Sequence, residues 1–179
     1  MKTQRALKRL TLAATLTAIS IAIDVFFKYA LGLTNFGVPF YAIPIVFGSI
    51  VLGPIYGVIM SVVGDAVGVM LSGYGYLPLF VLAPVFWGLI PGLIIRKDQE
   101  NLGKLAVTLF VAYSLASLAN TYAIYYYYSF ESAMATLYVR IGLIPFNTIV
   151  MFFMMRELMR KLKPVSERYL YQVLKTDKY

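Results

Sequence analysis

The sequence contains no cysteine and no histidine among its 179 residues. Without cysteine it has no disulfide framework, no thiolate nucleophile and no zinc site built on thiolates. Without histidine it has no imidazole base, no Ser–His catalytic pair and no histidine metal cluster. These absences remove the commonest catalytic and metal-binding constellations. We therefore expect a protein that is not an enzyme and that carries no metal or cofactor.

Charged residues are also scarce. They make up 13% of the chain, whereas 60% of its residues are apolar. Soluble domains are typically about a quarter charged and about half apolar. A compact fold of this length cannot hide so much apolar surface from water. The composition predicts an integral membrane protein and argues against a soluble enzyme, a nucleic-acid-binding module and a disordered chain.

Apolar segments of about the length that crosses a bilayer as a helix follow one another along the chain. They predict an all-α membrane domain with six transmembrane helices, which takes up residues 1–179 as a single domain. Gly53-Pro54 joins the second segment to the third with almost no loop. Residues 164–179 predict an amphipathic helix on the inner membrane surface, with a frayed polar tail as the alternative. The six segments are 8–30, 37–53, 54–71, 77–95, 104–128 and 136–159.

Positive charge is distributed unevenly over the connections between these segments. Of the 16 lysines and arginines, all but Lys28 and Arg140 lie at the start of the chain, between the fourth and fifth segments, or at the end of the chain. Loops rich in lysine and arginine stay in the cytoplasm. The pattern predicts a multi-pass protein of the cell membrane with both termini in the cytoplasm.

The charges that fall within the apolar segments include Asp65 in the third and Arg140 in the sixth. Charges in the hydrocarbon are costly and usually mark a functional site. At about 1.5 Å of rise per residue, both lie in the outer half of the membrane, as does Asn120. Asn147 follows Arg140 by two helical turns, so both can project from one face. These four residues predict an outward binding site, with an Asp65–Arg140 ion pair and an interhelical contact of Asn120 as the alternatives.

Aromatic residues gather at the same level. The fifth segment ends in a run of tyrosines that includes Tyr126, and Tyr74 and Tyr76 lie in the loop between the third and fourth segments. An aromatic belt at the membrane interface is one explanation. The other is a pocket with stacking walls for a flat, partly polar ring system, because the opposite ends of the segments have few aromatics.

Small residues recur at four-residue spacing, which lets helices approach closely. Most such pairs serve packing within the bundle, but Ala14 and Ala18 lie in the cytoplasmic half of the first segment and predict a docking stripe for another membrane subunit. The chain also lacks the G-x-x-x-x-G-K-[ST] phosphate loop. If it takes part in uphill transport, we expect the energy to come from a partner.

Several local motifs are distributed along nearly the whole chain, in addition to the small-residue stripe of the first helix. They are Ile43-Pro44-Ile45, Gly48, Leu52-Gly53-Pro54, Gly57, Gly64-Asp65, the loop Gly75-Tyr76-Leu77-Pro78-Leu79-Phe80, and Arg140 with Pro145-Phe146-Asn147. Together these motifs resemble the S component of an energy-coupling factor (ECF) vitamin transporter, most closely the folate-specific branch.

This resemblance implies a bacterial membrane subunit that captures folate from outside and then docks on a transmembrane coupling subunit served by two ATPases. The stripe of Ala14 and Ala18 would form the docking surface. The edge of the pterin ring would contact Arg140, Asn147 and Asp65. Its face would contact Tyr76, Phe80 and nearby aromatics, and the anionic tail would lie near Lys28.

The loop departs from the family pattern at Leu77, Leu79 and Val81, which replace Phe, Gly and Thr. Another vitamin, such as pantothenate or hydroxymethylpyrimidine, is therefore an alternative substrate for the same architecture. A structural membrane subunit without a ligand is an alternative of another class.

Overall fold

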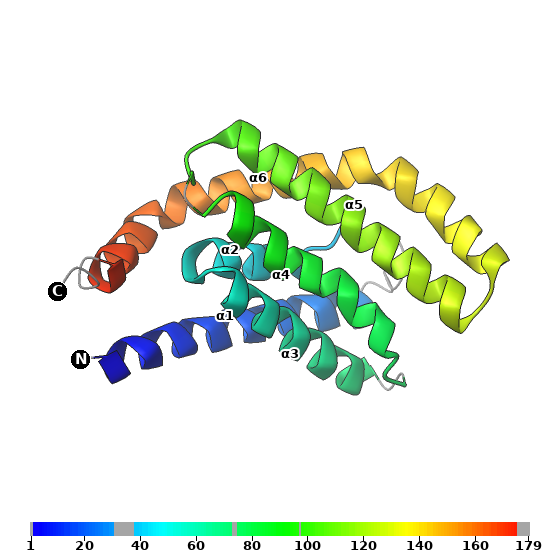
Figure 1. Cartoon of the computed structure of the whole chain (residues 1–179), viewed down its shortest axis with the longest axis horizontal. Helices are drawn as coiled ribbons and strands as arrows, with labels where there is room; N and C mark the ends of the chain where they lie inside the picture. The colour runs from blue at the N-terminus through cyan, green and yellow to red at the C-terminus, as the bar shows by residue number, and fades with distance from the viewer. Residues whose placement is uncertain (1, 31–37, 73–74, 97, 175–179) are drawn as a thin grey trace.

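The computed structural model describes residues 2–30, 38–72, 75–96 and 98–174, and its regular elements are all helices (Figure 1). In chain order they are α1 (Lys2–Ala30), α2 (Ala42–Leu52), α3 (Pro54–Ser72), the short 3-10 helix η1 (Pro78–Val81), α4 (Leu82–Ile94), α5 (Leu102–Tyr127) and α6 (Phe130–Leu174).

Each apolar segment of the sequence overlaps one of the α-helices, but the helices differ in length. Parts of α1, α3, α5 and α6 are long and apolar enough to cross a membrane, whereas α2 and the combined η1–α4 segment are shorter apolar helices. The structure is thus all-helical with four strong candidates for membrane spans, and six crossings stay a prediction. The helix α6 begins before residue 136 because Ser129 Oγ accepts a hydrogen bond from Ser132 N at 3.1 Å and caps it.

Both termini lie at the same end of the bundle (Figure 1). We call this the terminal end. The turn between α2 and α3 and the connection between α4 and α5 lie at this end too, whereas the α5–α6 connection lies at the opposite end. Successive helices therefore run antiparallel, as a chain that crosses a membrane repeatedly would require.

The turn at Gly53 shows how the sequence joins two helices without a loop. Gly53 has a φ of 107°, which glycine adopts without steric cost, and its N–H donates to Ser49 O at 2.9 Å. Pro54 then begins α3, where its missing N–H costs no hydrogen bond. The predicted turn at Gly53-Pro54 is confirmed.

The helix α2 forms the centre of the bundle. All of its residues are buried, and it packs against α1, α3, α4 and α6. The remaining contacts between α-helices link α1 to α3, α3 to α4, α4 to α5 and α5 to α6, and η1 packs against α3, α4 and α5. The other helices therefore surround α2. Because α2 contacts protein and not lipid along its length, it can be fully apolar without being as long as a membrane span.

Three glycines let α2, α3 and α4 approach one another closely. A Cβ added to Gly88 would overlap the backbone carbonyl of Gly57, and one added to Gly92 would lie 2.7 Å from Pro54 Cα. Ser49 Oγ donates a hydrogen bond to Gly88 O in the same contact. These positions bear out packing as the role of Gly57, Gly88 and Gly92.

We expect Gly88→Ala to destabilise the bundle by about 1–3 kcal/mol, because the obstacle to the new methyl group is backbone and cannot rotate away. Thermal unfolding in detergent measures the effect. Gly142→Ala is the matched control, since an added Cβ there meets no atom within 4 Å. Equal midpoints for the two variants would contradict the close packing.

Candidate functional site

A cavity of about 560 Å³ lies among the helices in the half of the bundle away from the terminal end. It is bordered mainly by the later parts of α1, α3 and α5 and by the early part of α6. The helix α6 begins at the end opposite the termini, so its early part lies beside the later parts of the other three. Its lining includes Ser20, Asp24, Phe27, Phe40, Tyr41, Ser61, Asp65, Phe80, Trp87, Tyr113, Ser117, Asn120 and Arg140.

Arg140 supplies the positive charge of this cavity. It lies on α6, and its Nε atom is buried without a hydrogen-bond partner in the part of the chain that the structure describes. A buried donor without an acceptor costs free energy, more so when it belongs to a charged group. A ligand carbonyl or anion in the cavity would supply the missing acceptor.

Two carboxylates line the cavity from neighbouring helices, Asp65 from α3 and Asp24 from α1. A Cβ added to Gly68 would lie 3.2 Å from Asp24 Oδ2, so this carboxylate rests against α3. Asp24 is not among the predicted site residues, although it lies inside the first apolar segment, where a charge in hydrocarbon equally indicates a functional site. Carboxylates at this position can accept hydrogen bonds from ligand N–H groups.

The floor of the cavity is aromatic. Trp87 and Tyr113 both line it and meet edge to face, with ring centroids 5.8 Å apart. Asn147 lies behind them, almost fully buried, and its Nδ2 donates to the Tyr113 hydroxyl at 2.6 Å. Asn147 therefore positions Tyr113 and does not itself line the cavity.

A second aromatic wall comes from the segment before α2. Phe40 packs on Phe27 of α1 with centroids 4.7 Å apart, and Tyr41 lies beside them in the lining. Ser20 Oγ donates to the Tyr41 carbonyl at 2.7 Å, which ties this segment to α1. The flat rings and the charged groups thus face the same space.

Phe80 enters the cavity from η1, and Tyr127 supports it from α5. Their rings are stacked within 15° of parallel at 6.3 Å, and Leu79 N donates to the Tyr127 hydroxyl at 3.4 Å. The neighbouring Tyr126, which the sequence analysis favoured, is 65% exposed. The helical phase of α5 directs Tyr127 inward and Tyr126 outward.

The structure thus brings four of the predicted substrate-binding residues into one cavity: Asp65, Phe80, Asn120 and Arg140. Tyr76 and Tyr126 lie outside its lining and are about half exposed or more. Tyr74 and the side chain of Lys28 lie outside the described residues. The predicted docking residues Ala14 and Ala18 are exposed on α1, whereas Ala13 and Thr17 face the bundle.

Chemically, this cavity offers one guanidinium donor, carboxylate and amide groups that can pair with N–H and C=O groups, and flat aromatic walls. Among the described residues, no group of three or more acidic side chains is arranged to hold a metal ion. The arrangement suits a small organic molecule with a flat ring and a polar edge.

Comparison with known proteins identifies a family for this chain. The family described as ECF-type riboflavin transporter, S component, matches residues 4–159. No curated protein and no solved structure matches the chain. The match covers most of the sequence and includes every described residue that lines the cavity. The chain therefore belongs to the S component family of ECF-type riboflavin transporters, whose members are substrate-binding membrane subunits of ECF vitamin transporters and not enzymes.

Proposed function

We propose that the cavity binds a vitamin built on a pteridine ring, folate in the first place, and that the chain passes it to the coupling subunit of an ECF importer. The observation that carries this proposal is the buried Arg140 Nε, which has no acceptor among the described residues and lies at the edge of a cavity with aromatic walls. A pteridine has a carbonyl for this donor and a flat face for the walls.

The other polar groups fit the rest of such a ring. A pterin carries an exocyclic amino group and a ring N–H beside its carbonyl, and Asp24, Asp65 and Asn120 offer acceptors for them. The rings of Trp87 and Phe80 can pack against its face. At about 560 Å³, the cavity has the size of a typical small-molecule site.

Riboflavin is the second candidate, because the matching family is named for it. Its ring system contains a pteridine dione, so it presents a carbonyl and an N–H on the same edge as a pterin does. The two vitamins differ in the third fused ring and in the tail. The groups that line the cavity therefore support a ligand with a pteridine ring, and identification of the bound ligand is needed to distinguish folate from riboflavin.

We also propose that all six helices cross the membrane, that both termini are cytoplasmic and that the cavity opens outward in a bacterial cell membrane. The clustering of lysine and arginine at the terminal end supports this orientation. Substrate would then enter from outside, and two partner ATPases would drive its release inside.

The exposed face of α1 supports a docking role for Ala14 and Ala18. Thr11 and Thr15 lie on the same face, and their hydroxyls donate to carbonyls one turn earlier at 2.9 Å. The side chains of these four residues are therefore small, and the two hydroxyl groups already donate hydrogen bonds within α1. Such a surface lets a second helix approach closely within the membrane.

Analysis of the co-purified ligand tests the substrate class. The chain is purified in detergent, denatured, and its released small molecules are identified by mass spectrometry. We expect a folate or a flavin in stoichiometric amount. Release of pantothenate or of a single-ring pyrimidine would overturn the pteridine proposal. A ligand-free protein that also fails to bind any added vitamin would favour the structural subunit.

A further inference from the structure

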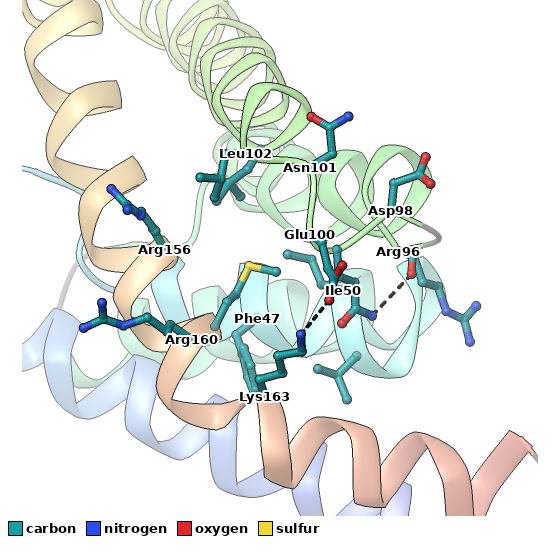
Figure 2. Close-up of a pocket in the computed structure, with 14 residues that line it drawn as sticks. Phe47, Ile50, Arg96, Asp98, Glu100, Asn101, Leu102, Arg156, Arg160 and Lys163 are labelled. Carbon is teal, nitrogen blue, oxygen red and sulfur yellow. Dashed lines mark hydrogen bonds and ion pairs between the residues drawn. The ribbon is translucent and has the colours of Figure 1, made fainter.

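A second recess, of about 800 Å³, opens at the terminal end of the bundle, and Figure 2 shows the residues that line it. It lies between the end of α2, the connection from α4 to α5, and α6. It exists because α2 stops at Leu52, whereas α6 continues beyond it to Leu174. The helix α6 therefore overhangs a space that α2 does not fill.

The inner wall of the recess is apolar. Phe47, Ile50 and Val51 of α2 form one side, and Leu105 of α5 and Met159 of α6 form the other. All except Met159 are buried in the core. Water molecules in this recess would make few hydrogen bonds to the apolar wall, so an acyl chain is the favoured occupant there.

The rim of the recess is positively charged. Arg156, Arg160 and Lys163 extend along α6, and Arg96 lies across the opening (Figure 2). Arg156 and Arg160 are one helical turn apart, near Leu102 at the start of α5. In the part of the chain that the structure describes, Arg96 and Arg156 form no ion pair.

The acidic residues of the rim already have cationic partners. Glu100 accepts from Lys163 Nζ at 2.5 Å, and Asp98 pairs with Lys104, which is not part of the lining. The hydrogen bond from Lys163 holds the pKa of the Glu100 carboxyl below its usual range, so this pair persists at neutral pH. Arg160 pairs with Glu157 of the same helix at 2.7 Å, outside the lining, but both side chains are about half exposed or more. With Arg96 and Arg156, the charge left over at the rim is positive.

We propose that this recess binds an anionic phospholipid from the leaflet at the terminal end, with an acyl chain against the apolar wall and its phosphate at Arg156 and Arg160. Basic pockets between membrane helices on the cytoplasmic side are suited to anionic headgroups, and each nearby cation adds about fivefold to the affinity, or about 1 kcal/mol. The proposal goes beyond vitamin binding, because the two sites lie at different ends of the bundle.

Lipid binding to the purified full chain tests this proposal by native mass spectrometry, with phosphatidylglycerol and phosphatidylcholine at equal concentration. We expect a preference for phosphatidylglycerol in the wild type. Arg156→Gln with Arg160→Gln is expected to reduce that preference about twentyfold or more, by the same fivefold step for each cation. Lys8→Gln with Lys161→Gln is the matched control, because both lysines are exposed and lie outside the lining.

The other outcomes overturn the proposal in distinguishable ways. Equal binding of the two lipids by the wild type, or equal losses in the two double variants, would remove the lipid site. Full displacement of phosphatidylglycerol by inorganic phosphate would show a site for free phosphate. Unchanged lipid preference together with loss of assembly with the coupling subunit would make the recess a protein interface.

Discussion

Replacing Arg140 with alanine is expected to weaken vitamin binding at least about 30-fold while leaving the protein folded. Arg140 Nε is buried at the cavity edge without a hydrogen-bond partner among the described residues, so we expect the ligand to provide its acceptor. Truncating one member of a desolvated, charge-assisted contact costs about 2–5 kcal/mol, and each 1.4 kcal/mol is about tenfold in affinity. Isothermal titration of the detergent-solubilised variant measures the loss.

Two further variants make this result specific. Arg140→Lys keeps the charge but loses the planar donor fork, so it should bind with intermediate affinity. Arg9→Ala removes an arginine from α1 near the terminal end and should bind as the wild type does. If folded Arg140→Ala keeps wild-type affinity, then Arg140 does not contact the ligand.

Much of the site could be predicted from the sequence because polar residues within apolar segments of membrane-spanning length are a strong signal of function. Asp65, Asn120 and Arg140 come from three helices, and the cost of burying each predicted that they would share a cavity. Asp24 gives the same signal, but it lies near the far end of α1, where a charge is easily taken for an interfacial one.

The aromatic residues could not be assigned in the same way. A run of tyrosines at the end of α5 has the same composition whichever of its members faces inward. Only the helical phase and the position of η1 decide that Tyr127 supports Phe80 and that Tyr126 is exposed. Burial of Trp87 and Tyr113 likewise depends on how α4 and α5 pack, which no local pattern specifies.

Helix lengths were predicted less well than helix positions. Hydropathy cannot distinguish a helix that spans lipid from one that is buried within the bundle, because both are apolar throughout. The helix α2 is the clear case: its whole length is buried, and it is shorter than a typical span. Capping at Ser129 extended α6 beyond the apolar segment for a local reason that hydropathy does not contain.

Replacing both Ala14 and Ala18 with leucine is expected to abolish assembly with the coupling subunit without weakening vitamin binding. Both alanines are exposed on α1 and contribute nothing to the cavity lining. In a close helix–helix contact, each inserted leucine would overpack the interface by about 1–3 kcal/mol, which weakens assembly about 5- to 100-fold. Co-purification of the coupling subunit and vitamin uptake by cells are the measurements.

The same exchange at another exposed alanine provides the control. Ala135→Leu places the same bulk on α6 toward the opposite end of the bundle, and it should assemble and transport normally. Leucine is a good helix former, so α1 itself should be unaffected. Normal uptake by the double variant would show that the coupling subunit docks elsewhere.

Binding of a pteridine vitamin in the cavity can be tested directly through Trp87. It is the one tryptophan of the chain, and it lines the cavity floor. Titrating the purified protein with folate, riboflavin and pantothenate while following tryptophan emission reports on binding at that place. We predict saturable quenching at sub-micromolar concentration by folate or riboflavin and no saturable change with pantothenate. Saturable quenching by pantothenate, or none by either pteridine with folded protein, would contradict the account.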